Sequence, residues 1–355
     1  MDLNNLLSES SKFIKLEFNL QLEKSQLKSY SPKHWKEFCQ VNIFDVKSNG
    51  FYIPKSYSAY VRTDSSSLVS DAFHELFGHG LFCEHSQIGK QLVDIIQNKG
   101  DEKSFLFDEV NPQEQSLGLC KNNIQNYEGF AVWLESLLCE KTSNSKTWQL
   151  KKKGLPDEYV ALYEYFQGIE QKLTRFGFMS QLGFPKFYDN KKVIDTAKRL
   201  YESAFLNVNF VVLYGSQKPK SDIDLFIVSS NSPTNFFNGW LDIYEVNKRQ
   251  FNDYLKKLDI SITDPLFSGK LIYGDKNSFE QLKQQVLNQS ITKEAINHNF
   301  VEAEKQKQYL LEFKNQPRQR KDSLAYIKSF TQNAEQLQKG NKPLTLKNLK
   351  QIYSK

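Results

Sequence analysis

The stretch "SDAFHELFGHGLFCEH", residues 70–85, holds three of the chain's five histidines. The apolar spacing in "LVSDAFHELFGHGLF" predicts a helix. A His-Glu-x-x-His helix presents two imidazoles one turn apart, with the glutamate placed as a base. Here His79 follows His74 by five residues, so an ideal helix would leave the two imidazoles about 140° apart. Both can bind one ion only if the helix widens locally, and Gly78 makes such a widening easier.

Two glutamates on a later helix are candidates for the third ligand. The segment "NYEGFAVWLES" carries Glu128 and Glu135, which are seven residues apart and therefore share a helix face. One of them can coordinate the ion, while the other can bind a ligand imidazole and fix its tautomer without contacting the ion. Imidazole and carboxylate ligands suit both zinc and non-heme iron.

The run "HELFGHG" resembles the HExxGH motif of the dipeptidyl peptidase III family, and its pairing with "EGFA" resembles the tubulin tyrosine carboxypeptidases. These resemblances cover two short stretches. They imply a Zn²⁺ ion held by His74, His79 and Glu128, with Glu75 as the catalytic base that activates water for hydrolysis of a peptide or protein substrate. The run is also similar to the iron-binding aromatic amino acid hydroxylases, in which the segment matching "ESLLC" would favour Glu135. A non-heme iron oxygenase and a non-catalytic, metal-stabilised binding module are therefore the alternatives for this domain.

A second constellation lies in "FVVLYGSQKPKSDIDLFIV", which predicts a strand, a Gly-Ser turn and a second strand. Alternation along the second strand puts Asp222 and Asp224 on the same side. Two carboxylates placed in this way can hold Mg²⁺ and, through it, a nucleoside triphosphate. Gly215 lets the backbone approach a phosphate, and the hydroxyl of Ser216 can donate to it.

A third carboxylate is expected from the neighbouring strand "WLDIYEV". Asp242 would act there as the general base or as a ligand of a second metal ion, with Glu245 as the alternative. Lys218 and Lys220, in the turn between the first two strands, are candidate phosphate contacts.

The Gly-Ser turn, "SDIDL" and the later aspartate closely resemble the polymerase-β-like nucleotidyltransferase superfamily, over about residues 195–276. The resemblance implies Mg²⁺-dependent transfer of a nucleotidyl group, with ATP as the expected donor, to a protein, a small molecule or an RNA end. A transferase with an inactive first domain is the alternative for the whole chain. Five residues separate Ser216 from Asp222, fewer than in the usual members, so the phosphate loop is shortened.

The predicted fold class is α+β with two domains. Residues 1–188 form a mostly helical metallopeptidase-like domain, and residues 189–277 form a small α/β nucleotidyltransferase domain. Residues 278–355 form a helical C-terminal region. Within the first domain, "VNIFDV" and "FYIPKSYSAYV" are expected to be strands, and residues 99–118 a loop.

Composition limits the partners and the compartment. The net charge of +6 is mild for 355 residues and does not indicate nucleic-acid binding. The four cysteines form no CxxC pair. The sequence shows no signal peptide and no run of about 18 apolar residues, so we expect a cytoplasmic protein with no membrane contact.

Overall fold

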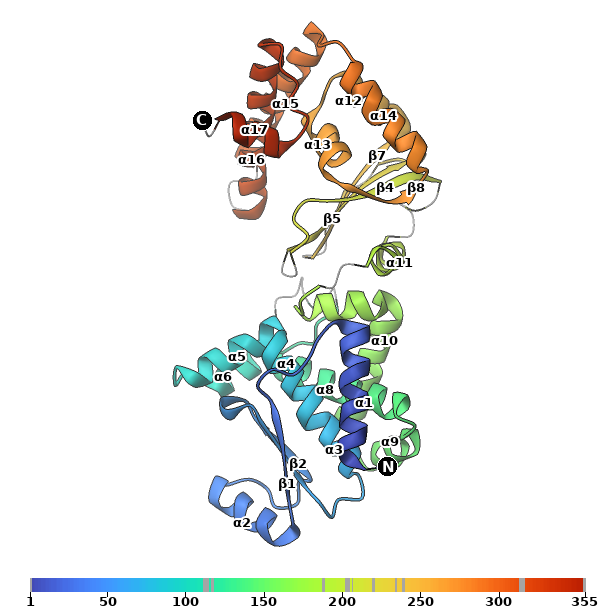
Figure 1. Cartoon of the computed structure of the whole chain (residues 1–355). Helices are drawn as coiled ribbons and strands as arrows, with labels where there is room; N and C mark the ends of the chain where they lie inside the picture. The colour runs from blue at the N-terminus through green and yellow to red at the C-terminus, as the bar shows by residue number, and fades with distance from the viewer. Residues whose placement is uncertain are drawn as a thin grey trace. The chain divides into compact units, whose positions relative to one another are not determined.

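The computed structural model describes residues 2–110, 115, 118–186, 189–201, 205, 207–218, 221–233, 235–237, 240–312 and 317–353. The chain divides into two compact units, Met1–Arg199 (unit 1) and Leu200–Lys355 (unit 2). Helices dominate both units and each contains a small sheet (Figure 1), which confirms the predicted α+β, two-domain fold class. The finer division at residues 188 and 277 stays a prediction. Within the described residues, no helix combines the length and the apolar character needed to cross a membrane.

Unit 1 is built mainly from helices around one apolar core. Its helices are α1 (Leu3–Phe18), α2 (Pro32–Asn42), η1 (Pro54–Ser56), α3 (Leu68–Ala72), η2 (Phe73–His79), α4 (Gly80–His85), α5 (Gln87–Gln97), α6 (Glu102–Phe107), α8 (Asn123–Lys141), α9 (Ser145–Lys152), α10 (Asp157–Gln181) and α11 (Asn190–Leu200). The central helix α8 is buried over most of its length, including Phe130, Trp133 and Leu138. It packs against both η2 and α10, so it links the two helical halves of the unit.

A three-stranded sheet flanks these helices in the order β1-β3-β2 (Gln26–Tyr30, Ser58–Arg62 and Gly50–Ile53). β3 pairs in parallel with β1 and antiparallel with β2, so β3 is central and β2 is an edge strand. The predicted segment "FYIPKSYSAYV" therefore forms two strands, β2 and β3, joined by η1.

Two local predictions for unit 1 are wrong. Residues 41–46 form no strand, because α2 runs to Asn42 and ends with Ile43 in a left-handed conformation. Pro32 at the first turn of α2 favours that helix, and Trp35 and Cys39 bury one side of it against the sheet. Residues 99–118 are not all loop either, since Asp101 caps α6 by accepting from the backbone N–H groups of Lys103 and Ser104.

Unit 2 contains a five-stranded sheet in the order β6-β7-β5-β4-β8. The strands are β4 (Val208–Tyr214), β5 (Ile223–Ser229), β6 (Asn235–Phe237), β7 (Leu241–Asn247) and β8 (Lys270–Gly274). β5 and β7 pair in parallel, and the other neighbours pair antiparallel. The strand of "DIDLFIV" and the strand of "LDIYEV" are therefore direct neighbours. The sequence analysis expected the third carboxylate to come from such a neighbouring strand.

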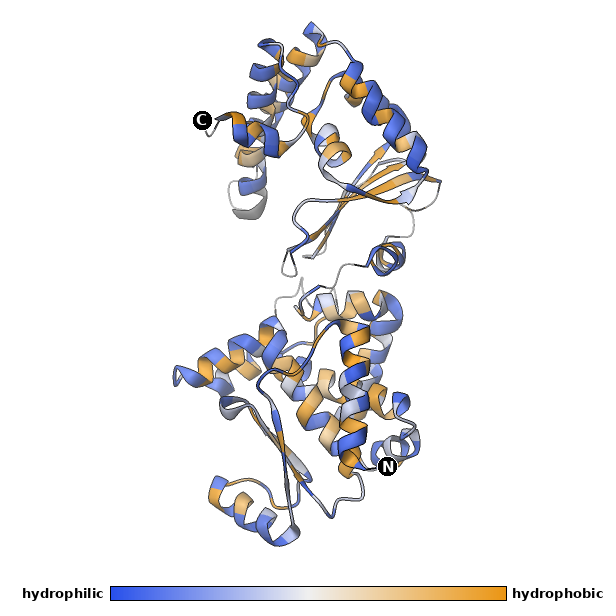
Figure 2. Ribbon diagram, viewed as in Figure 1, coloured by the Kyte–Doolittle hydropathy of each residue, from blue (hydrophilic) through white to orange (hydrophobic). Residues whose placement is uncertain are grey.

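Amphipathic helices cover one face of this sheet. The helices of unit 2 are α12 (Lys248–Lys256), α13 (Ile260–Ser268), α14 (Lys276–Asn288), α15 (Lys293–Glu312), α16 (Pro317–Gln338) and α17 (Leu346–Tyr353). Phe251, Ile262 and Phe279, from α12, α13 and α14, share a core with Phe210 and Phe226 of the sheet. Figure 2 shows the hydrophobic strands and the mixed polar and apolar surfaces of α12 and α14. α15 and α16 pack closely on each other.

Candidate functional sites

The helix that carries the HELFGH run widens where its spacing requires it. Residues Phe73–His79 form the π-helix η2, between the α-helices α3 and α4. A π-helix bonds each residue to the fifth along the chain, so residues five apart face the same side. His74 and His79 meet accordingly, with ring centroids 4.7 Å apart. The local widening anticipated from the spacing of the two histidines is thus present.

Three side chains converge at this point from two elements. Nε2 of His74 lies 3.6 Å from Oε2 of Glu128, and Nε2 of His79 lies 3.7 Å from the same oxygen. The ligand atoms of the three residues all lie within 4.8 Å of one another, the one such group among the described residues. Two imidazole nitrogens and one carboxylate oxygen form a donor set that fits zinc, and also non-heme iron.

The second glutamate of α8 lies behind the first histidine. Nδ1 of His74 donates to Oε2 of Glu135 at 2.9 Å, and Glu135 is almost fully buried. This bond fixes the ring so that Nε2 faces Glu128. Of the two arrangements that the sequence left open, the geometry favours Glu128 as the ligand and Glu135 as the residue that orients His74.

The two histidines differ in charge when no cation is bound. Burial lowers the pKa of His79 to about 3, so its ring is neutral, the form that binds metal. Burial would also lower the pKa of His74, but the nearby carboxylates of Glu128 and Glu135 outweigh it and raise that pKa to about 10. Without a cation, a proton on His74 balances the two carboxylates, and a bound cation would take over that role.

Glu75 lies in the same helix but outside the group of three. Its Oε2 is 4.0 Å from Nε2 of His79, and its side chain is 12% exposed. The backbone of β2 passes close by, since a Cβ on Gly50 would lie 2.8 Å from Cγ of Glu75. Burial raises the pKa of Glu75 to about 8. A carboxylate placed beside a donor set that fits zinc, and against strand β2, has the position expected of a general base.

Gly78 is needed for packing against the neighbouring helix. A Cβ at this position would lie 2.7 Å from both Cα and Cβ of Ala131 in α8. The sequence analysis attributed Gly78 to crowding inside its own turn. The structure adds a second reason for a glycine at this position. Without a side chain at Gly78, η2 approaches α8 closely enough to bring Glu128 near both histidines.

A partly buried lysine completes the support of the cluster. Nζ of Lys151, in α9, lies 2.7 Å from Oε1 of Glu135 and 2.9 Å from Oδ1 of Asp71. Ser70 donates to Glu135, and Ser67 donates to Asp71. Lys151 thus balances two carboxylates within the protein.

The sequence analysis missed three residues that touch the cluster. Lys151 carries no motif signal, because lysines in a run such as "LKKKG" usually face solvent. The ring of Tyr127 stacks on His79 with centroids 4.0 Å apart, and its position next to Glu128 was a usable signal. Tyr159, in α10, donates a hydrogen bond to Glu128 and could not be paired with it from sequence alone.

In unit 2, two of the predicted carboxylates lie side by side. Asp224 of β5 is in register with Asp242 of the parallel strand β7, and with Tyr214 of β4 on its other side. Asp222 immediately precedes β5. Among the described residues, the carboxylate oxygens of these three aspartates do not all lie within 4.8 Å of one another, as the ligand atoms of the histidine cluster do. Mg²⁺ commonly binds through one or two carboxylates and completes its shell with phosphates and water, so the pair suits that ion.

Glu245 lies on the other face of β7. It follows Asp242 by three residues, and it accepts a hydrogen bond from the buried hydroxyl of Ser229 at 2.6 Å. Of the two candidates for the third carboxylate, the strand geometry therefore favours Asp242.

The Gly-Ser turn reaches the same pair. Gly215 has a φ of +71°, and a Cβ there would lie 2.1 Å from Oδ2 of Asp224, so only glycine fits. Ser216 accepts a hydrogen bond from Ser221 at 3.0 Å, which closes the short loop. Lys218 is exposed in this loop, and Lys220 lies outside the described residues.

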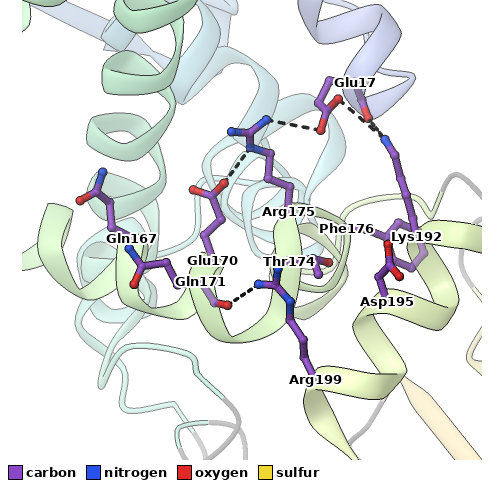
Figure 3. A pocket seen from close by; sticks show the side chains of 10 residues that line it. All are labelled: Glu17, Gln167, Glu170, Gln171, Thr174, Arg175, Phe176, Lys192, Asp195 and Arg199. Atoms are coloured by element: carbon purple, nitrogen blue, oxygen red, sulfur yellow. Dashed lines mark hydrogen bonds and ion pairs between the residues drawn. The ribbon is translucent and has the colours of Figure 1, made fainter. Parts of the chain in front are cut away.

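Unit 1 also contains a polar cavity of about 440 Å³, shown in Figure 3. Arg175 lies between two carboxylates there, 2.7 Å from Glu170 and 3.6 Å from Glu17. Lys192 also pairs with Glu17, and Arg199 donates to the carbonyl oxygen of Gln171. Since its cationic side chains are engaged by groups of the protein, we assign no ligand to this cavity.

Comparison with known proteins adds little to this geometry. No protein-family model matches the chain, and no curated protein matches it. The chain is similar to the crystal structure of a nucleotidyltransferase-like protein from Exiguobacterium sibiricum 255-15, with 12% identity and a TM-score of 0.25. The match covers 42% of this chain and 59% of that one. A superposition this weak assigns neither the fold nor the function of this chain.

Proposed function

We propose that unit 1 is a zinc-dependent peptidase whose metal ion is held by His74, His79 and Glu128. The observation that carries the proposal is the π-helix η2, which brings two histidines five residues apart to one carboxylate. A π-turn inside an α-helix is rare and occurs frequently at functional sites. The buried support of His74 by Glu135 is a second reason, because metal-binding histidines commonly have such a partner.

The remaining groups have roles that follow from their positions. Zinc, when bound, supplies Lewis acidity and makes water a nucleophile near neutral pH. Glu75 accepts the proton of the attacking water and delivers it to the leaving amine. Glu135 holds the ring of His74, and Tyr159 holds Glu128 from the opposite element.

The edge strand β2 offers a place for an extended peptide. Among the described residues, β3 of the predicted segment "FYIPKSYSAYV" is paired on both sides, whereas β2 is paired on one side only. Gly50, the first residue of β2, lies against Glu75. An extended substrate that pairs with this edge would pass its backbone along the base.

Metal analysis of the purified chain and of His79→Ala tests the metal site. We expect about one zinc per chain in the wild type and none in His79→Ala, because the variant lacks one of three ligands. His85→Ala is the control. Nε2 of His85 bonds the carbonyl oxygen of Gln21 and takes no part in the cluster, so this variant should keep its zinc.

Two outcomes would contradict the zinc assignment. Iron in place of zinc would favour the oxygenase alternative, since two histidines and one carboxylate also form an iron site. No metal in the wild type after growth with added zinc would reduce residues 74–135 to a structural pair of helices.

We further propose that unit 2 transfers a nucleotidyl group from a nucleoside triphosphate, with ATP as the expected donor. The observation that supports this is the pair Asp224 and Asp242, aligned on parallel neighbouring strands with Gly215 against Asp224. Mg²⁺, when bound there, offsets the charge of the phosphates. Asp242 then holds the acceptor hydroxyl as base, and the Gly215–Ser216 turn donates to a phosphate oxygen.

Gly215→Ala tests this proposal. We expect transfer of label from α-labelled ATP to fall by about 10²-fold, because the new Cβ would lie 2.1 Å from Oδ2 of Asp224 and force this carboxylate to move. Gly168→Ala is the control, since a Cβ there meets nothing within 4 Å. Asp242→Asn, which keeps the shape of the side chain, should lose transfer as well. Transfer that persists in both variants, or without Mg²⁺, would refute the assignment.

A further inference from the structure

A cavity of about 810 Å³ lies in unit 1 beside the histidine cluster. It is lined from α8, from α10 and from the chain that precedes α8. Glu128 and Tyr159, which bond to each other, both face it. The cavity therefore reaches the carboxylate that we assign to the metal.

Part of the wall next to this carboxylate is apolar. Ile124 lies one turn before Glu128 on α8, and Leu162 lies one turn after Tyr159 on α10. Both are partly buried and pack against the core of unit 1, which fixes their positions. Tyr165 continues the same wall one turn further along α10.

The charges of the lining do not neutralise a charged ligand. Lys121 is 66% exposed and pairs with Glu109 at 3.0 Å, so its charge is directed to solvent. Glu158 and Glu128 would repel an acidic side chain. Glu158 is exposed to solvent, and Glu128 is the carboxylate that we assign to the metal. A basic side chain would therefore lose its hydration against Ile124 and Leu162 without gaining a buried partner of its own.

We propose that this cavity receives an apolar side chain of the peptide substrate, from a residue next to the cleaved bond. The proposal rests on the peptidase function proposed above and specifies its substrate class. Ile124 and Leu162 are then the residues that determine specificity. Burial of a leucine-sized side chain against them should raise kcat/KM by about 10- to 100-fold over alanine at that position.

The test is cleavage of a peptide library that varies one residue on either side of the bond. We expect the wild type to prefer leucine, isoleucine and phenylalanine over aspartate and lysine at one of the two positions. Leu162→Lys should lose this preference, and the milder Leu162→Ala should shift it towards larger side chains. Leu16→Lys is the matched control, because Leu16 is 81% exposed on α1. This variant should keep the substrate preference of the wild type.

The outcomes separate the two proposals. Cleavage that depends on Glu75 but shows no apolar preference, or a preference that Leu162→Lys retains, overturns the cavity proposal alone. Cleavage that Glu75→Gln leaves intact overturns the peptidase proposal.

A binding measurement tests the cavity proposal even if no peptide of the library is cleaved. We expect N-acetyl-leucine hydroxamate to bind the zinc-loaded chain at least about tenfold more tightly than N-acetyl-aspartate hydroxamate in calorimetry, with the difference lost in Leu162→Lys. Equal binding of the two compounds overturns the cavity proposal whether or not any peptide is cleaved.

Discussion

Glutamine in place of Glu75 is expected to leave zinc bound and to lower peptide hydrolysis by about 10²- to 10⁴-fold. Glu75 lies 4.0 Å from His79 but does not belong to the group of three ligands, so its replacement should not release the metal. Glutamine has nearly the same shape and fills the space beside β2. It cannot accept a proton from water, and the loss should therefore appear in kcat.

The measurement pairs initial rates on a peptide mixture with zinc content for the same preparations. Glu140→Gln is the matched control, because Glu140 lies on α8, is 64% exposed and only pairs with Lys141. Full activity in Glu75→Gln would exclude this residue as the base. Joint loss of zinc and activity would instead make Glu75 part of the metal site.

The spacing of the histidines and glutamates predicted much of the first site. The spacing of five positions from His74 to His79 required a widened helix, and this requirement can be read from one segment of the sequence. The spacing of seven positions from Glu128 to Glu135 placed both on one helix face, but it did not show how deeply each is buried. Only the packing of η2 on α8 decides which of the two meets both imidazoles.

Contacts between distant segments set the limit of such prediction. Residues 41–46 alternate enough to suggest a strand, yet α2 reaches Asn42, and Val41 and Ile43 are left exposed. In unit 2, "WLDIYEV" offered Asp242, with Glu245 as the alternative. The parallel register of β5 and β7, which no local pattern reveals, aligns Asp242 with Asp224.

Methionine in place of Lys151 is expected to lower the free energy of unfolding of unit 1 by about 3–5 kcal/mol. The Lys151 side chain is 16% exposed, and its ammonium group lies within 3 Å of both Glu135 and Asp71. Burial alone would lower the pKa of Lys151, but these carboxylates outweigh it and raise the pKa. Without the ammonium group, two buried carboxylates remain close together with no shared cation.

Urea unfolding of the metal-free chain, followed by tryptophan fluorescence, measures this loss, because Trp35, Trp133 and Trp148 all lie in unit 1. Lys152→Met is the matched control. Lys152 is the next residue, pairs with Glu164 at 3.3 Å near the surface, and should contribute less than about 1 kcal/mol. Asp71→Asn combined with Lys151→Met should recover part of the loss, since it removes one of the two repelling charges. Equal stability of the two methionine variants would show that Lys151 does not stabilise the two carboxylates. Lys151 could then not be the cation that keeps Glu135 in place behind His74.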